Sequence, residues 1–267
     1  MPGMMRIVLT RNNYHSLEAE REFMSRSQYL GFLSCEAKQM AKLSGEWTDE
    51  KSDALLVGSY VHAWCEGRRK EFIAETPEMF TQKGTLRAEF KCADKMIATL
   101  EADPFCMYML QGEKEVILTA EFAGATWKVM LDVYNRERRR IVDLKTTKSI
   151  REKSWSEEHG GRVSFVEQYH YPLQAAIYSE IERRANRPED EWFDFYVVAV
   201  SKENYPDKEV IAMHNTDRYV IELQRIADNM PRVLAVKSGQ AEPIRCERCD
   251  YCRSTRQLRG AVHYSEL

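Results

Sequence analysis

The chain has 267 residues, of which 43% are hydrophobic and 30% charged, and its formal net charge is −3. This composition is that of a globular protein, and no apolar run reaches the roughly 20 residues of a membrane-spanning helix. The N-terminal segment 1–11 lacks the apolar stretch of a signal peptide, so we expect a cytoplasmic protein without a membrane partner. The slightly acidic balance argues against a protein that coats DNA by bulk positive charge.

The N-terminal part of the chain has helical patterning. Apolar residues recur at helical spacing, and serines that suit N-caps stand near the expected helix starts. We predict helices over residues 18–44, 52–73 and 90–102. Neither repeats nor flexible linkers divide the sequence, so we expect one domain over 1–267 that ends in a Cys-rich segment at 246–252.

The middle of the chain changes to a strand-like pattern. Three runs rich in β-branched residues are separated by turn signals, which predicts an antiparallel meander over 116–122, 127–134 and 140–146. A helix over 165–186, a buried strand over 193–200, a strand beginning near Ile211 and a helix over 216–238 follow. This order predicts an α/β fold in which helices flank a central mixed β-sheet.

Acidic residues interrupt two of the expected strands. Side chains two residues apart point to one face of a strand, so Asp143 and Lys145 share a face. Asp132 lies on the preceding strand, and the short turn between the strands predicts that Asp132 and Asp143 lie side by side on one surface. Two close carboxylates repel unless a cation lies between them, and Mg²⁺ prefers such oxygen ligands. Lys145 would then orient an attacking water or stabilise the developing charge.

The Asp-x-Lys triplet by itself is weak support. Such a triplet is more often a solvated charge pair, and Asp49-Glu50-Lys51 has the same pattern. Asp143 differs because it follows an apolar β run and because a strand with its own Asp precedes it. Buried-looking strands rarely carry charges without a reason.

With these residues in order, the sequence resembles the PD-(D/E)xK nuclease superfamily, which has a restriction-endonuclease-like core. Within it, the sequence is similar to phage-type RecE-like exonucleases related to the RecB nuclease domain. The resemblance covers about residues 25–252, and its motifs appear in the family's order. They are Gly58-Ser59-Tyr60-Val61-His62, then Glu121, then Asp132, then Asp143-Leu144-Lys145-Thr146-Thr147, and last Gln174-Ala175-Ala176-Ile177-Tyr178. Leu131 stands where the family often has proline.

The resemblance implies roles for individual residues. His62, Asp132, Asp143 and the backbone carbonyl of Leu144 would bind Mg²⁺, for which Mn²⁺ can substitute, and Glu121 would support the metal site. Gln174 and Tyr178, four apart on one helix face, would face the scissile phosphate. The alternative for His62 is a histidine satisfied by a neighbour such as Glu66, and the alternative for Gln174 and Tyr178 is helix packing.

Several basic residues are candidates for contacts with DNA phosphates. Lys148, Arg151 and Lys153 follow the strand that carries Lys145, and Lys202 follows the apolar strand 193–200. Weaker candidates occupy the preceding turn, where a basic run is usually a solvated face: Arg136, Arg138, Arg139 and Arg140.

The C-terminal segment concentrates cysteines. Cys246, Cys249 and Cys252 are three of seven in the chain, and an odd total without a secretion signal argues against a disulfide framework. Thiolates select zinc or iron–sulfur clusters. By resemblance, Cys35 would be the fourth ligand of a 4Fe–4S cluster, although the second gap is shorter here than in those relatives. The alternative is a set of reduced cysteines without a metal.

Together these features predict a Mg²⁺-dependent deoxyribonuclease. By resemblance, it would be an exonuclease that resects linear double-stranded DNA ends in phage-type recombination, with a single-strand annealing protein as partner and a homo-oligomeric ring as assembly. One alternative is a RecB-like or CRISPR-associated iron–sulfur nuclease. The non-enzyme alternative is an inactive nuclease fold that only binds DNA or a protein partner.

Overall fold

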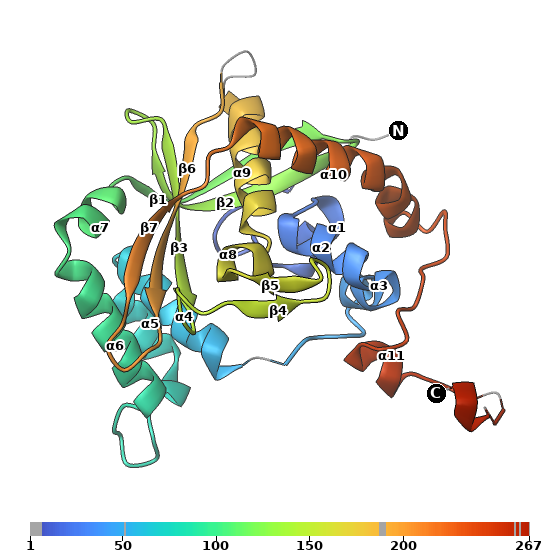
Figure 1. The fold of residues 1–267 in the computed structure, drawn as a ribbon, viewed down its shortest axis with the longest axis horizontal. Helices are drawn as coiled ribbons and strands as arrows, with labels where there is room; N and C mark the ends of the chain where they lie inside the picture. The colour runs from blue at the N-terminus through green and yellow to red at the C-terminus, as the bar shows by residue number, and fades with distance from the viewer. Residues whose placement is uncertain (1–6, 51, 187–190, 259, 262, 267) are drawn as a thin grey trace.

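A mixed β-sheet forms the centre of the molecule. The computed structural model describes residues 7–50, 52–186, 191–258, 260–261 and 263–266 (Figure 1). The sheet has five strands in the order β1-β2-β3-β6-β7. They are β1 (Glu113–Phe122), β2 (Ala125–Asn135), β3 (Arg140–Thr147), β6 (Asp194–Ser201) and β7 (Lys208–Ala212). The β3–β6 pair is parallel and the other pairs are antiparallel, which confirms the predicted meander and the α/β class.

The turn between β1 and β2 sets the register of the whole hairpin. Ala123 and Gly124 both have positive φ, 47° and 80°. A two-residue hairpin turn of this kind matches the twist of its strands, and it pairs Phe122 with Ala125. Every later pair along β1 and β2 follows from that closing pair.

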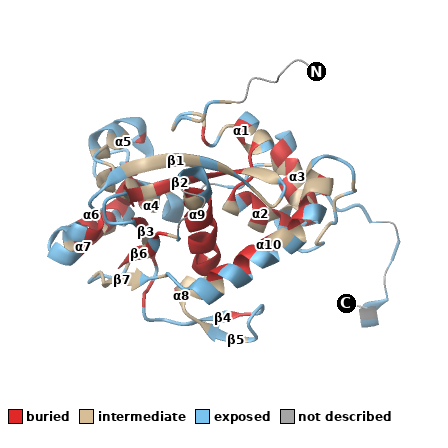
Figure 2. Cartoon of the chain, turned by 90° about the horizontal axis from the view of Figure 1, so that it is seen from above, coloured by how far each residue is buried: buried red, intermediate tan, exposed pale blue. Residues whose placement is uncertain are grey.

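Helices cover both faces of the sheet and form two apolar cores. One core joins β1, β2 and β6 to α2 (Arg26–Ser34), α3 (Glu36–Ser44), α9 (Tyr171–Asn186) and α10 (Thr216–Lys237). The other joins β2, β3 and β6 to α4 (Asp53–Cys65), α6 (Ala88–Glu101) and α7 (Pro104–Met109). Figure 2 shows that α9 is buried along most of its length, whereas α10 exposes one side. The outward side of α10 is mostly polar, as expected for a helix that covers the outside of a core, although Val220 and Ile221 are also exposed there.

The three long predicted helices in the N-terminal half and before β6 are divided. Residues 18–44 form α1 (Leu17–Glu22), α2 and α3, because Ser16, Ser25 and Cys35 are extended and cap new helices with their side chains. Residues 52–73 form α4 and α5 (Arg69–Glu75), separated at Gly67 with φ of 76°. Residues 165–186 form α8 (Phe165–Gln168) and α9, separated at His170 with φ of 53°.

Several short elements had not been predicted. They are α7, the hairpin of β4 (Ser154–Ser156) and β5 (Gly161–Val163), α11 (Asp250–Ser254), and the 3-10 turns Pro77–Met79 and Tyr264–Glu266. Each is too short to show a period in the sequence. None of the described helices is both long enough and apolar enough to cross a bilayer.

The second Asp-x-Lys triplet lies outside the sheet. Asp49 forms ion pairs with Lys38, at 2.9 Å, and Lys42. Lys51 and residues 1–6 lie outside the described residues. Asp49 is therefore a surface ion-pair partner, as an isolated triplet usually is.

Trp127 provides a test of the core beneath β2. It is fully buried, contacts the rings of Tyr29 and Phe122, and donates its indole N–H to the carbonyl of Phe122 at 2.9 Å. Trp127→Ala should lower the free energy of unfolding by about 3–5 kcal/mol, measured by urea denaturation. Trp155→Ala is the control, because Trp155 is 64% exposed and its loss should change stability by less than about 0.5 kcal/mol. Equal losses in both variants would contradict this placement of the core.

Candidate active site

The site begins where β2 and β3 separate. The two strands pair at Asn135–Arg140, Tyr134–Ile141 and Val133–Val142. At the next position the backbone ladder stops, and the Oδ2 atom of Asp132 accepts a hydrogen bond from the N–H of Leu144 at 2.9 Å. A carboxylate therefore takes the place of a backbone carbonyl, and the strands diverge like a fork.

The fork changes which face of β2 each side chain occupies. We had expected Asp132 and Asp143 on one surface of a regular sheet. Leu131 belongs to the core on the α9 side, whereas Val133 belongs to the core on the α4 side. The alternation therefore breaks at Asp132, and its carboxylate lies between the strands instead of on one face. On β3 the expected alternation holds, with Val142 and Leu144 in the α4-side core.

Asp143 and Lys145 form the centre of the site on β3. The Nζ atom of Lys145 lies 2.7 Å from Oδ2 of Asp143, and Gln174 Nε2 donates to Oδ1 of Asp143 at 2.7 Å. Gln174 comes from α9, so the structure brings it to the predicted acidic residue. Tyr178 lies one turn later and lines the same cavity as Asp132, Asp143 and Lys145.

His62 approaches from the opposite helix layer. Its Nδ1 atom lies 3.4 Å from Oδ2 of Asp132. Helix α4 passes beside β3 at Gly58, where a Cβ atom would lie 3.4 Å from Oγ1 of Thr146, an ordinary van der Waals contact. The structure therefore places His62 against Asp132 and not against Glu66.

Burial and charge act in opposite directions on these groups. Burial raises the pKa of Asp143, and the nearby Asp132 raises it further despite Lys145. Burial also favours the neutral form of Asp132, but His62 and Lys145 outweigh burial and lower its pKa. For Lys145, the attraction of Asp143 and Asp132 exceeds the effect of burial and raises its pKa. Burial, then Asp143, raises the pKa of Tyr178 to about 12, so Tyr178 is a neutral hydrogen-bond donor.

Two cavities open from the fork. One of about 210 Å³ lies toward α9 and is lined by Asp132, Asp143, Lys145, Gln174 and Tyr178 among others. The other, about 580 Å³, lies toward α4 and includes His62, Asp132 and Lys145. Asp132 and Lys145 line both cavities, so a substrate in either one would meet them.

Glu121 does not reach this site. It pairs with Thr126 near the β1–β2 turn, and its side chain accepts a hydrogen bond from the Thr126 hydroxyl. The register places Glu115 opposite Asp132, because Lys114 pairs with Val133 and Val116 with Leu131. Counting back from the Ala123-Gly124 turn would have found Glu115.

Glu115 is part of an acidic pair beside the fork. Glu66 and Glu115 both line the larger cavity, and Arg11 forms ion pairs with both, at 2.7 Å to Glu66. Arg68 also lies 2.7 Å from Glu66. Burial and the nearby Glu115 raise the pKa of Glu66 to about 7. The sequence had suggested Glu66 only as an alternative partner for His62.

The predicted DNA-contacting residues have different environments. Lys202 lines the larger cavity and donates from Nζ to the carbonyl of Ala54 at 3.1 Å. Arg151 forms ion pairs with Asp207, at 3.0 Å, and Glu209, at 2.8 Å. Lys148 is almost fully exposed, and Lys153 is exposed as well. The structure therefore brings Lys202, but neither Lys148 nor Arg151, into the walls of the two cavities.

The polar atoms of the site suit a hydrated divalent cation. Among the described residues, Oε1 of Gln174 is buried without a hydrogen-bond partner, and the ammonium of Lys145 is the one partner of the buried Oδ2 of Asp143. A cation with bound water would supply both a positive charge and hydrogen-bond donors to these oxygens. Leu144 is fully buried within β3, so only its backbone is available to the site.

The four predicted cysteines converge at the other end of the molecule. Among the described residues, the only group of three or more potential metal ligands with donor atoms within 4.8 Å of one another is Cys35, Cys246, Cys249 and Cys252. Cys35 links α2 to α3, and Cys252 lies on α11. The Cys35 and Cys252 sulfurs are 3.6 Å apart, well beyond a disulfide bond of about 2.05 Å.

The cysteines of this cluster differ in the pKa of their thiols. The backbone N–H of Arg248 lowers the pKa of Cys246 to about 6, whereas burial raises the pKa of Cys252 to about 12. Four thiolates this close would repel without a cation. These residues therefore can hold a thiophilic metal ion.

Comparisons with known proteins agree with this arrangement. A family model described as a PDDEXK-like domain of unknown function, DUF3799, matches residues 25–255. The crystal structure of a "putative exonuclease" from Eubacterium rectale is 40% identical, covers 98% of each chain and has a TM-score of 0.91. A match to the crystal structure of SSO0001 spans 80% of this chain and 90% of that one at 15% identity, but its TM-score of 0.29 is too low to indicate a shared fold. A search of curated proteins found no significant match. The chain therefore belongs to the PDDEXK-like family DUF3799 and has the fold of the PD-(D/E)xK nucleases.

Proposed function

We propose that this protein is a metal-dependent deoxyribonuclease that removes nucleotides from the ends of linear double-stranded DNA. The observation that carries the proposal is the Asp143–Lys145 ion pair at 2.7 Å, set beside Asp132 in a fork that opens into two cavities. The relative from Eubacterium rectale, 40% identical over nearly the whole chain, is described as a "putative exonuclease" and supports the same activity here.

The metal ligands would be Asp132, Asp143, His62 and the backbone carbonyl of Leu144. Mg²⁺ is the expected ion and Mn²⁺ the substitute, since both suit carboxylate and carbonyl oxygen ligands. When bound, the ion supplies Lewis acidity and lowers the pKa of a coordinated water. His62 must be neutral to act as a ligand, so its bond to Asp132 would be exchanged for the ion.

The remaining groups position the reactants. Lys145 is held by Asp143 with its ammonium facing both cavities, where it can orient water and stabilise charge on the phosphate. Gln174 fixes Asp143 and keeps its carboxamide oxygen free to accept a hydrogen bond from water. Tyr178 would donate its hydroxyl proton to a phosphate oxygen. Lys202 is the best placed of the candidate phosphate contacts, followed by the exposed Lys148, Arg151 and Lys153.

The cellular role that we propose rests on the resemblance to phage-type recombination exonucleases. Such an enzyme would resect DNA ends for a single-strand annealing protein and act as a homo-oligomeric ring in the cytoplasm. A ring would retain the strand between successive cleavages and so compensate for the acidic net charge of −3.

At the cysteine cluster we propose a structural metal centre, with a single zinc ion favoured over a 4Fe–4S cluster. Four sulfurs at about 2.3 Å from one tetrahedral ion lie about 3.8 Å from one another. The Cys35–Cys252 and Cys246–Cys252 sulfur distances are 3.6 and 4.0 Å. A cluster binds each cysteine through a different iron and would need the sulfurs farther apart.

The nuclease assignment predicts loss of activity at the fork. With Mg²⁺ and end-labelled linear duplex DNA, Asp132→Ala and Lys145→Ala should each lower the cleavage rate by on the order of 10²–10³-fold, because the first removes a proposed metal ligand and the second removes charge stabilisation at the phosphate. Lys95→Ala, an exposed lysine on α6 that contacts Asn204, is the control and should cleave like wild type. Labels at the 5′ and 3′ ends give the polarity. Equal activity in wild type and both site variants would refute the assignment.

His62 predicts the pH dependence of metal use. Burial alone would lower its pKa, but Asp132 raises it above the ordinary 6.5. Protons therefore compete with the metal, and the Mg²⁺ concentration for half-maximal cleavage should rise by about tenfold per pH unit below that pKa.

His62→Gln should weaken this pH dependence, whereas His263→Gln near the C-terminus should keep it. Cleavage rates across a Mg²⁺ series between pH 5.5 and 8.5 provide the measurement. A half-maximal Mg²⁺ concentration that does not change with pH in wild type would remove His62 from the ligand set.

The cysteine centre predicts bound metal in the purified protein. Full-length protein prepared without oxygen should contain one zinc per chain and lack a visible absorption band. Cys252→Ala should lose the zinc and on the order of a few kcal/mol of folding stability, because the metal binds only the folded state. Cys92→Ala, outside the cluster, should retain it. Iron with a visible band would instead identify a cluster, and protein without any metal would refute the centre.

A further inference from the structure

The junction between α8 and α9 carries two tyrosines that extend outward from the proposed active site. The ring centroid of Tyr171 lies 5.1 Å from Nζ of Lys145. The ring of Tyr169 stacks on that of Tyr171, with centroids 5.9 Å apart and planes 29° apart. Tyr171 is only 8% exposed, whereas Tyr169 is 52% exposed. Two aromatic rings thus lead from the partly buried Lys145 to solvent.

The two rings differ in what the fold requires of them. Tyr171 packs against Phe165 in the core, with ring centroids 6.0 Å apart. Within the described part of the chain, the ring of Tyr169 contacts one other aromatic ring, that of Tyr171, and about half of the residue is exposed to solvent. Single exposed aromatic residues are common on protein surfaces. Tyr169 differs from those because its ring is aligned with a second ring that touches the proposed catalytic lysine.

The backbone under Tyr169 is fixed from the side of the active site. Arg26, which lines the cavity of about 210 Å³, donates hydrogen bonds to the carbonyl oxygens of Tyr169 and of His170, the latter at 3.4 Å. His170 has a φ of 53°, so the chain turns sharply between the two helices. The turn at His170 therefore places Gln174 beside Asp143 and also leaves the side chain of Tyr169 at the surface.

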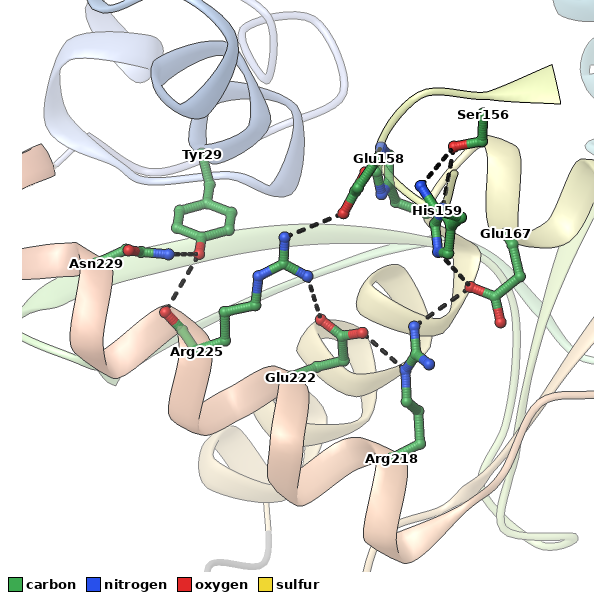
Figure 3. A network of polar contacts seen from close by, with 10 residues as sticks. Tyr29, Ser156, Glu158, His159, Glu167, Arg218, Glu222, Arg225 and Asn229 are labelled. Atoms are coloured by element: carbon green, nitrogen blue, oxygen red, sulfur yellow. Dashed lines mark hydrogen bonds and ion pairs between the residues drawn. The ribbon is translucent and has the colours of Figure 1, made fainter. Parts of the chain in front are cut away.

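A polar network fixes the junction from the side of α10 (Figure 3). Arg218 donates to Glu167 of α8 at 3.3 Å and to Glu222 at 2.8 Å. Arg225 lies 3.7 Å from Glu222 and donates at 3.2 Å to Glu158 of the β4–β5 turn. Arg26 holds the junction from one side and Arg218 from the other. The backbone at Tyr169 is therefore already ordered, so little conformational entropy is lost when a ligand binds there.

We propose that Tyr169 is a stacking platform for a base of the DNA strand being cut, one or two nucleotides from the scissile phosphate. This rests on the proposed nuclease function and adds a nucleotide contact to it. A base offers its face to a side-chain ring where it has left the duplex stack, so we place this contact on an unpaired part of the strand. Stacking accepts every base, as a nuclease without sequence preference requires.

The test measures binding separately from cleavage. Full-length protein is titrated into fluorescent 12-nucleotide single-stranded DNA with a chelator present, and a matched series carries one abasic residue at each position. Wild type should lose about 5- to 150-fold in affinity at one or two adjacent positions and little elsewhere. Tyr169→Ala should bind the intact strand that much more weakly and show no sensitive position.

Two further variants separate stacking from damage to the fold. Tyr169→Phe keeps the ring and should bind like wild type. Tyr264→Ala removes a tyrosine that is 82% exposed near the C-terminus and should do the same. The proposal is overturned if wild type shows no sensitive position, or if Tyr169→Ala keeps the same one. Because these measurements need no catalysis, a protein that binds but never cuts DNA contradicts the proposed function and leaves this contact intact.

Discussion

The hydrogen bond from the N–H of Leu144 to the carboxylate of Asp132 is the interaction on which the site depends. It ends the β2–β3 ladder without leaving the backbone donor of Leu144 unpaired, a loss that would cost about 1–3 kcal/mol in a buried position. The fork can therefore open inside the protein. Because the strands diverge there, side chains from both helix layers reach the two neighbouring aspartates, His62 contacting Asp132 and Gln174 contacting Asp143. His62 arrives from the α4 side and Gln174 from the α9 side, which a closed sheet would keep apart.

The site also brings together two negatively charged aspartates that a single lysine does not fully neutralise. Asp132, Asp143 and Lys145 have low exposure, and a single lysine faces two carboxylates. The pKa values of the two aspartates move in opposite directions, because His62 and Lys145 lower that of Asp132, whereas burial and the nearby Asp132 raise that of Asp143. Such an arrangement costs stability and is typical of a functional site. Lys128 shows the structural contrast, because it is buried beside the site but is paired with Glu20 at 2.8 Å.

The sequence predicted the β3 half of the site better than the β2 half. Alternation along a regular strand was enough to place Asp143 with Lys145 and Leu144 in the core. Helical spacing was enough to place Gln174 and Tyr178 together. Asp132 could not be placed this way, because its position follows from the broken ladder. Glu121 was wrongly expected near the metal, since the choice between it and Glu115 depends on the register that the Ala123-Gly124 turn sets. Helix ends at Cys35 and His170 were missed because side-chain caps and a positive φ are decided by tertiary contacts.

The cysteine cluster joins positions that are 217 residues apart in the chain. Cys35 stands between two of the first helices, and Cys252 follows the last long one. The folded chain places Cys35, between α2 and α3, beside Cys252 on α11, so their sulfurs lie 3.6 Å apart. A link across so long a loop removes much of the freedom of the unfolded chain, and about 5 kcal/mol is expected from closure of a 100-residue loop in the entropic account. A metal ion held by these four sulfurs would therefore tie the N-terminal helices to the C-terminal segment, across the whole stretch of chain that forms the sheet.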